Sequence, residues 1–259
     1  MGSNLTDLVT ARYILLTRIF IVVLGCIAVW FGIIGFSISW RESSIERIAD
    51  RIIAGDPFKN DILVQQLPIM ADIRSSAYCH PAALRSAAII QLRMFEVGAS
   101  TTGRSRVEEL ESLRSEIRNS LFCSPADPFL WLALYRLESD QRGVSAASLK
   151  YLKMSYELGP NEGWIQVKRN PNAFAFFERL PADLAEKAIN EFVELLNSDF
   201  YRQAVEIFIG PAWPARHAIL PRLSKLPIQV REYFVRAVYD RGLDITIPGT
   251  EAPNSRSEH

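Results

Sequence analysis

Two cysteines, Cys79 and Cys123, occupy the same place in two copies of one short motif. The copies span residues 73–81 and 117–125, lie 44 positions apart and are identical at five of nine positions. A disulfide between them would join one helix pair to the next if the domain folds in an oxidising compartment. The third cysteine, Cys26, lies inside a long apolar run. The pattern therefore predicts a Cys79–Cys123 disulfide.

The same position also suits a plain packing role. In a third, fainter copy that ends at Pro160, Leu158 stands in the place of the cysteines, and a free cysteine packs as a small hydrophobe. Equivalent positions of stacked helices lie about 8–10 Å apart, whereas a disulfide needs its two Cα atoms within about 7 Å. The sequence leaves both interpretations open.

The other reactive side chains do not fall into a catalytic or metal-binding pattern. None of the three histidines has a cysteine or carboxylate at metal-ligand spacing: His80, His217 and His259. The chain has no glycine-rich phosphate loop, nucleophile elbow or zinc-protease motif. We therefore expect a protein that is not an enzyme, with no catalytic, cofactor-binding or metal-binding residues. The alternative is an enzyme whose active-site residues are distant in the sequence and come together only in the folded protein.

Charge excludes one class of partner. The chain has 29 lysine and arginine residues against 29 aspartate and glutamate residues. Such a balance gives no overall field that would attract nucleic acid. We expect no nucleic-acid partner.

An uncharged apolar run covers residues 19–40. As a helix it would reach about 33 Å, enough for the hydrocarbon core of a bilayer. Arg18 precedes the run, and Arg41 and Glu42 follow it. A cleaved signal peptide has a shorter apolar region that ends in small residues, whereas this run ends at Trp40. The pattern predicts an N-terminal transmembrane helix over 19–40 after a cytoplasmic tail over 1–18.

The sequence gives only weak signals about the orientation of that helix in the membrane. Basic residues lie on both sides of the run, so the positive-inside rule does not decide. A short basic tail before a long apolar run is the usual signal-anchor layout, and the cysteines favour an oxidising compartment. We expect a single-pass protein of the bacterial inner membrane with a periplasmic domain.

Helical periodicity continues through the rest of the chain. Residues 41–72 are expected to form a juxtamembrane helical linker. Beyond it, apolar helices beginning at Pro81 and Pro128 alternate with amphipathic ones over 105–122 and 144–158. In each motif copy a proline forbids the helix from continuing, and another helix then begins. Helical hairpins are therefore expected over 73–165.

These hairpins resemble tetratricopeptide repeats. The likeness rests on residues 147–162, which are similar to the second helix and exit loop of such a repeat, and on the spacing of the motif copies. The full tryptophan–glycine–tyrosine pattern of the family is absent, and the first spacing is longer than a repeat. The whole layout is similar to single-anchor repeat proteins of alphaproteobacteria, some of which are associated with cell-surface polysaccharide production.

The expected fold is therefore all-α: an N-terminal transmembrane helix and a tetratricopeptide-like solenoid with a helical C-terminal cap. The cap covers residues 166–247, and within it residues 170–172 are expected to interrupt the helices. Residues 248–259 are expected to be a disordered tail. Four side chains are expected to mark the core: Trp131, Leu134, Leu152 and Tyr156.

A solenoid offers a concave surface to protein segments. We therefore expect an anchored scaffold or adaptor that binds a protein partner, itself a membrane protein, at the outer face of the bilayer. The resemblance implies an alternative: an accessory subunit of a polysaccharide polymerisation or export complex.

Overall fold

The computed structural model describes the backbone of residues 3–76, 78–98 and 105–250. Within α1, residues 3–15, 31 and 33–42 are described by their backbone alone. The chain forms two compact units, Met1–Glu116 and Ile117–His259. Because the boundary falls at residues 116 and 117, it lies inside the expected repeat region 73–165.

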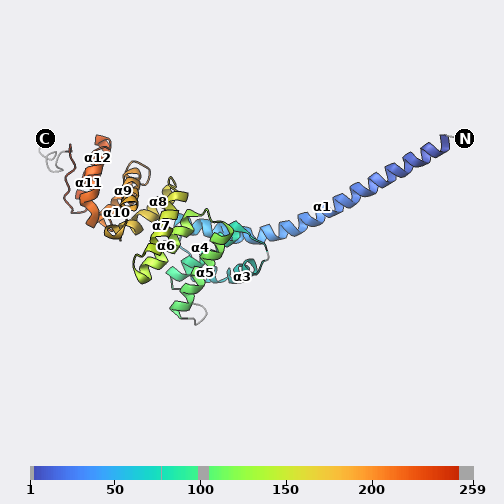
Figure 1. The fold of residues 1–259 in the computed structure, drawn as a ribbon, viewed down its shortest axis with the longest axis horizontal. Coiled ribbons are helices and arrows are strands. Elements are labelled where there is room, and N and C mark those ends of the chain that lie inside the picture. Colours follow the sequence, from blue (N-terminus) through green and yellow to red (C-terminus); the bar gives the residue numbers. More distant parts are fainter. Residues whose placement is uncertain (1–2, 77, 99–104, 251–259) are drawn as a thin grey trace. The chain divides into compact units, whose positions relative to one another are not determined.

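The expectation of an all-helical fold is confirmed over the described residues, which contain no strand (Figure 1). The α-helices are α1 Ser3–Ala54, α2 Asn60–Val64, α3 Leu67–Ser75, α4 Pro81–Glu96, α5 Arg106–Cys123, α6 Pro128–Arg142, α7 Ala146–Leu158, α8 Gly163–Phe174, α9 Ala182–Leu196, α10 Tyr201–Ile209, α11 Arg216–Leu223 and α12 Ile228–Tyr239. Two short 3₁₀ turns, η1 Phe177–Arg179 and η2 Trp213–Ala215, connect helices in the second unit.

The first unit is built around the C-terminal end of α1. That end packs on α4, and α2 and α3 cover the same cluster of apolar side chains. The buried members are Ile45, Leu63, Met70, Ile73, Ala83, Ala87, Ile90 and Met94. At about 25 cal/mol per Å² of buried apolar surface, this cluster is a main source of stability for the first unit.

The second unit is a series of paired helices. The pair α6 and α7 is followed by α8 and α9, on which α10 and α11 pack, and α12 packs on α10. Aromatic rings run through its core: the ring centres of Phe174 and Phe192 lie 6.1 Å apart, and those of Phe208 and Phe234 lie 4.9 Å apart. Contacts at these spacings add to the energy of area burial.

Two helices extend beyond the apolar segments that mark them in the sequence, and one expectation about the elements was wrong. The apolar run and the helical segment after it form one continuous helix, α1, of 52 residues. Residues 170–172 do not interrupt the helix, contrary to the expectation from the sequence, because α8 continues through Pro171 to Phe174. The first helix of the pair α6–α7 continues to Arg142, beyond its apolar portion.

The expected anchor and tail lie partly outside the described residues. Among the residues whose side chains are described, no helix is long and apolar enough to cross a membrane. The side chains of residues 31 and 33–40 of the expected anchor are not among these, and residues 251–259 of the expected tail lie outside the described residues.

Candidate functional site

The two cysteines expected to pair belong to different units. Cys79 lies between α3 and α4 in the first unit, and Cys123 is the last residue of α5, in the second unit. The disulfide therefore stays a prediction from the sequence.

Three of the four core markers are buried. Leu134 on α6 and Leu152 and Tyr156 on α7 are each at most 4% exposed. Trp131 differs from the expectation because it is only partly buried. Its indole Nε1–H donates to the Pro125 carbonyl at 2.8 Å, and its ring stacks on Tyr151 at 5.7 Å between ring centres. Trp131 thus borders the α6–α7 pair instead of filling its interior.

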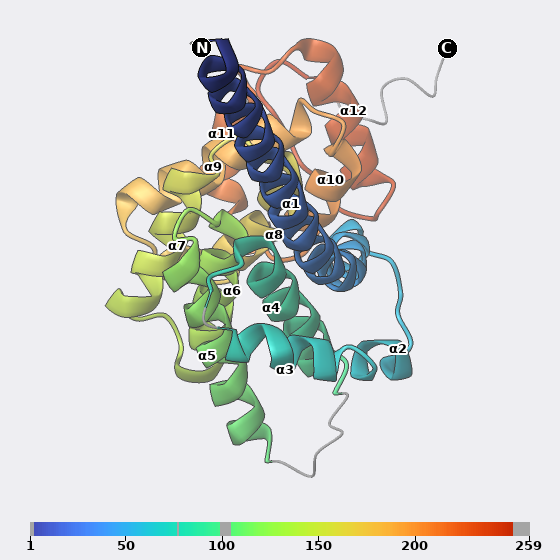
Figure 2. The same ribbon diagram turned by 90° about the vertical axis from the view of Figure 1, so that its right-hand side faces the viewer.

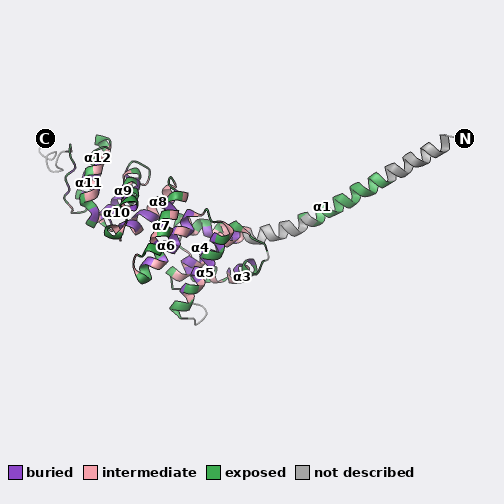
Figure 3. Ribbon diagram, viewed as in Figure 1, coloured by how far each residue is buried: buried purple, intermediate pink, exposed green. Residues whose placement is uncertain are grey.

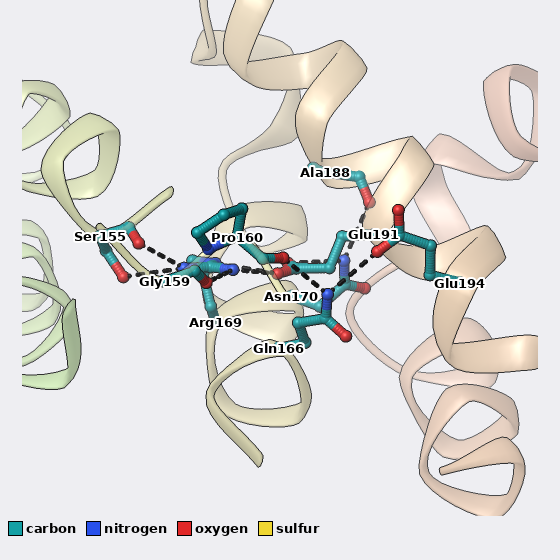
Figure 4. A network of polar contacts seen from close by, with 9 residues as sticks. All are labelled: Ser155, Gly159, Pro160, Gln166, Arg169, Asn170, Ala188, Glu191 and Glu194. Atoms are coloured by element: carbon teal, nitrogen blue, oxygen red, sulfur yellow. Dashed lines mark hydrogen bonds and ion pairs between the residues drawn. The ribbon is translucent and has the colours of Figure 1, made fainter. Parts of the chain in front are cut away.

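A buried guanidinium, that of Arg169, is the centre of a polar network in the second unit (Figure 4). Arg169 lies on α8 and is 0% exposed. It reaches that depth because Ile165 and Ala173, four residues before and after it, are buried on the same stripe of the helix. The periodicity of α8 therefore points this charge into the core.

All five N–H groups of Arg169 find acceptors. Nε and Nη2 donate to Oε1 of Glu191 on α9, at 2.9 and 2.5 Å. Nη1 donates to the carbonyl and hydroxyl oxygens of Ser155, and Nη2 also donates to the Gly159 carbonyl. A buried charge is tolerated only with such complete pairing.

The same contacts close the end of a neighbouring helix. Ser155 belongs to the last turn of α7, and Gly159 follows its last residue. Carbonyl groups at a helix C-terminus carry partial negative charge and lack intrahelical donors. Arg169 therefore caps α7 from α8 while it pairs with Glu191 on α9, which ties three helices together.

Two amides of α8 extend the network toward α9. Asn170 Nδ2 donates to the Ala188 carbonyl at 2.9 Å and to Glu191 Oε2 at 3.3 Å. Gln166 Nε2 donates to the Pro160 carbonyl and to Glu194 Oε2, at 2.9 and 3.0 Å. Both oxygens of Glu191 are thus engaged, so this carboxylate serves as a structural acceptor.

Burial changes the proton affinity of two members. It raises the pKa of Glu191, against the opposing effect of the Arg169 charge and of the hydrogen bonds that Glu191 accepts. It also raises the pKa of Tyr156 well above its ordinary value, with a contribution from the Glu191 charge. The Arg169 guanidinium lies 4.2 Å from the centre of the Tyr156 ring. A cation over the ring face adds an attraction that strengthens on desolvation.

The first unit contains a second buried carboxylate. Glu116 on α5 is 3% exposed and accepts a hydrogen bond from Arg74 on α3 at 3.0 Å. Burial raises the pKa of Glu116, while the Arg74 charge lowers it by a smaller amount. This pair links α3 to α5 within the unit.

The sequence does not single out Glu191, Glu116 or the buried Arg169. Arg169 stands beside Lys168 in a polar stretch, which is typical of an exposed face. The available signal was the four-residue spacing of Ile165, Arg169 and Ala173, which places the arginine on the apolar stripe. The partner Glu191 depends on the packing of α9 and has no comparable signal.

A different kind of surface lies on α1. Every residue from 16 to 30 is exposed, and most of these residues are apolar; Phe20 and Trp30 are 66% and 67% exposed (Figure 3). A Cβ atom added at Gly25 or Gly32 would meet nothing within 4 Å. A helix that is apolar all round normally lies in a protein core or a bilayer.

The described residues hold no group of three histidine, cysteine or acidic side chains that could bind a metal ion. Comparison with known proteins gives no relative: no family model, curated protein or solved structure matches the chain.

Proposed function

We propose that the protein is a membrane-anchored helical scaffold that binds a protein partner beside the bilayer. The observation that carries this proposal is the run of exposed apolar side chains over residues 16–30 of α1. Exposed to water, such a run would be costly at about 25 cal/mol per Å². The bilayer is the environment in which an apolar helix of this kind is stable.

The sequence beyond residue 30 supports the same assignment. Residues 19–40 contain no charged residue, and Arg18 and Arg41 bound the run. The remainder of the chain supplies paired helices, the architecture that tetratricopeptide-like proteins use to hold protein segments. The polar network around Arg169 has its donors and acceptors directed at one another, which suits a rigid scaffold more than a reaction centre.

The anchor is tested by membrane extraction of the full chain. We expect the native protein to sediment with membranes and to resist alkaline carbonate. The double variant Val22→Arg, Val29→Arg should be released, because an arginine near the centre of a spanning helix costs about 2.5–3.5 kcal/mol on insertion scales.

The matched control is Tyr233→Arg, which places the same charge on an exposed aromatic residue of α12. It should remain with the membranes. Release of the native chain by carbonate would refute the anchor. The scaffold role is tested separately, by crosslinking in intact membranes and mass spectrometry after purification in mild detergent; a chain recovered without a crosslinked protein would refute it.

A further inference from the structure

The expected anchor is joined to the core of the first unit without a flexible linker. The helix α1 runs unbroken from Ser3 to Ala54. The apolar run ends at Trp40, and the first described buried residue after it is Ile45, at 0% exposed. Five residues of helix span only about 7.5 Å. The core of the unit therefore begins within two turns of the end of the anchor.

The chain then reverses toward the anchor. Gly55 ends α1 with φ of 93°, a left-handed conformation that favours glycine. The backbone N–H groups of Gly55 and Asp56 donate to the carbonyls of Ile52 and Arg51. The Arg51 side chain fixes the turn, because its Nε donates to Asp56 Oδ2 at 2.7 Å and its guanidinium lies 5.0 Å from the Phe58 ring centre.

After this turn, α2 and α3 pack beside the same part of α1. Leu63 on α2 and Met70 and Ile73 on α3 share one buried cluster with Ile45. Figure 1 places α3 on the side of the first unit from which α1 extends toward its N-terminus. In Figure 2, seen from that side, α3 lies toward the viewer next to α4, and α2 lies to the right of α3. This layer is therefore the part of the unit that faces the anchor.

We propose that α2 and α3 rest on the headgroup layer of the bilayer that holds α1. The inference depends on the proposed anchor. The hydrocarbon core is about 30 Å thick and the whole bilayer about 40–45 Å, which leaves about 5–8 Å of headgroups on each side. The buried cluster that α2 and α3 form with Ile45 begins about 7.5 Å beyond the hydrocarbon, next to that zone.

The exposed side chains of the layer fit a neutral surface. Two basic residues, Lys59 and Arg74, are balanced by two acidic residues, Asp61 and Asp72. Ile62 is an exposed apolar residue at 40%. Attraction to acidic lipids requires a cluster of basic residues, and this mixture does not form one. The contact is therefore held by the geometry of α1 and does not need anionic lipid.

The test places a photocrosslinker in the layer. The substitution Ile62→p-benzoylphenylalanine is made in the full chain, which is reconstituted in phosphatidylcholine vesicles with a radiolabelled headgroup and illuminated. The same amino acid at Val107, an exposed residue at the start of α5, is the control. We expect at least fivefold more lipid label at position 62 than at position 107.

A second variant moves the layer away from the bilayer. Seven helix-forming residues inserted between Ser43 and Ser44 lengthen α1 by about 10 Å and nearly preserve its rotation. The insertion should lower lipid labelling at position 62 several-fold. Equal labelling at positions 62 and 107, or labelling unchanged by the insertion, overturns the inference. Carbonate extraction of the same samples separates this result from failure of the anchor, because an anchored chain without labelling refutes only the headgroup contact.

Discussion

The arginine at position 169 shows how one residue can determine the arrangement of three helices. A guanidinium removed from water loses hydration worth several kcal/mol. Its five N–H groups recover that energy from Glu191, Ser155 and Gly159 only when α7, α8 and α9 are all in place. The interaction contributes more to the specificity of packing than to net stability, because an apolar replacement of the whole pair can be equally stable.

Removal of the arginine alone should therefore be severe. We expect Arg169→Met to lower the free energy of unfolding by about 3–5 kcal/mol, because Glu191 stays buried without its counter-charge. The double variant Arg169→Met, Glu191→Leu should recover part of the loss. Urea unfolding followed by circular dichroism measures both. Lys168→Met, at the neighbouring half-buried position, is the control; a similar loss there would show that α8 itself, and not the ion pair, is sensitive.

The raised pKa of Glu116 gives a pH-dependent contribution to stability. Since the folded state holds this proton more tightly than the unfolded state, the contribution is fully present below the ordinary pKa of 4.5 and is lost as the pH rises through the raised value. Glu116→Gln, which resembles the protonated acid, should therefore gain stability relative to the native chain as the pH rises from about 4 toward neutrality. Chemical unfolding at several pH values measures this difference. A difference that falls with pH would mean that the attraction of Arg74 dominates burial.

At the scale of elements, the sequence predicted most helices because their signals are local. A proline begins α4 and α6, and the 3–4 spacing of apolar residues marks α5, α7 and α9. Pro171 by its type predicts a break in the helix at residues 170–172, but a proline costs a helix only one hydrogen bond and a local clash. The polar network and the aromatic core on either side of α8 hold the helix together there.

Burial within the α6–α7 pair can be measured with matched leucines. Leu152 on α7 is 0% exposed, and Leu149 on the same helix is only half-buried. Leu152→Ala should cost about 2–5 kcal/mol, as cavity-forming changes do, and Leu149→Ala distinctly less. Thermal or urea unfolding of the two variants compares them directly. Equal losses would mean that the face of α7 turned toward α6 has been assigned incorrectly.

At the scale of the whole molecule, the chain divides within one helix. The first unit ends at Glu116 and the second begins at Ile117, while α5 runs from Arg106 to Cys123. A repeat alignment by sequence treats residues 73–165 as a single stack and so has no means of finding this division. It depends on which long-range contacts form, and periodicity alone does not encode those contacts.

The predicted Cys79–Cys123 disulfide would cross this division. Closing a loop of this length would stabilise the fold by about 3–4 kcal/mol in the chain-entropy model. We expect one thiol, that of Cys26, to react with a maleimide in denaturant before reduction, and three thiols after it. Mass spectrometry counts the labels. Three labels without reductant would leave both cysteines in the packing role that Leu158 has in the third motif copy.

The complete pairing of Arg169 also has a consequence for exchange with solvent. Its Nε–H proton lies in a buried bond to Glu191, so it can exchange with deuterium only when α7, α8 and α9 separate. Arginine side-chain protons at the surface exchange quickly, and this one should persist. A single slow resonance in a nitrogen-15 spectrum would thus report the opening of the second unit. Its lifetime would measure that opening without any probe attached to the protein.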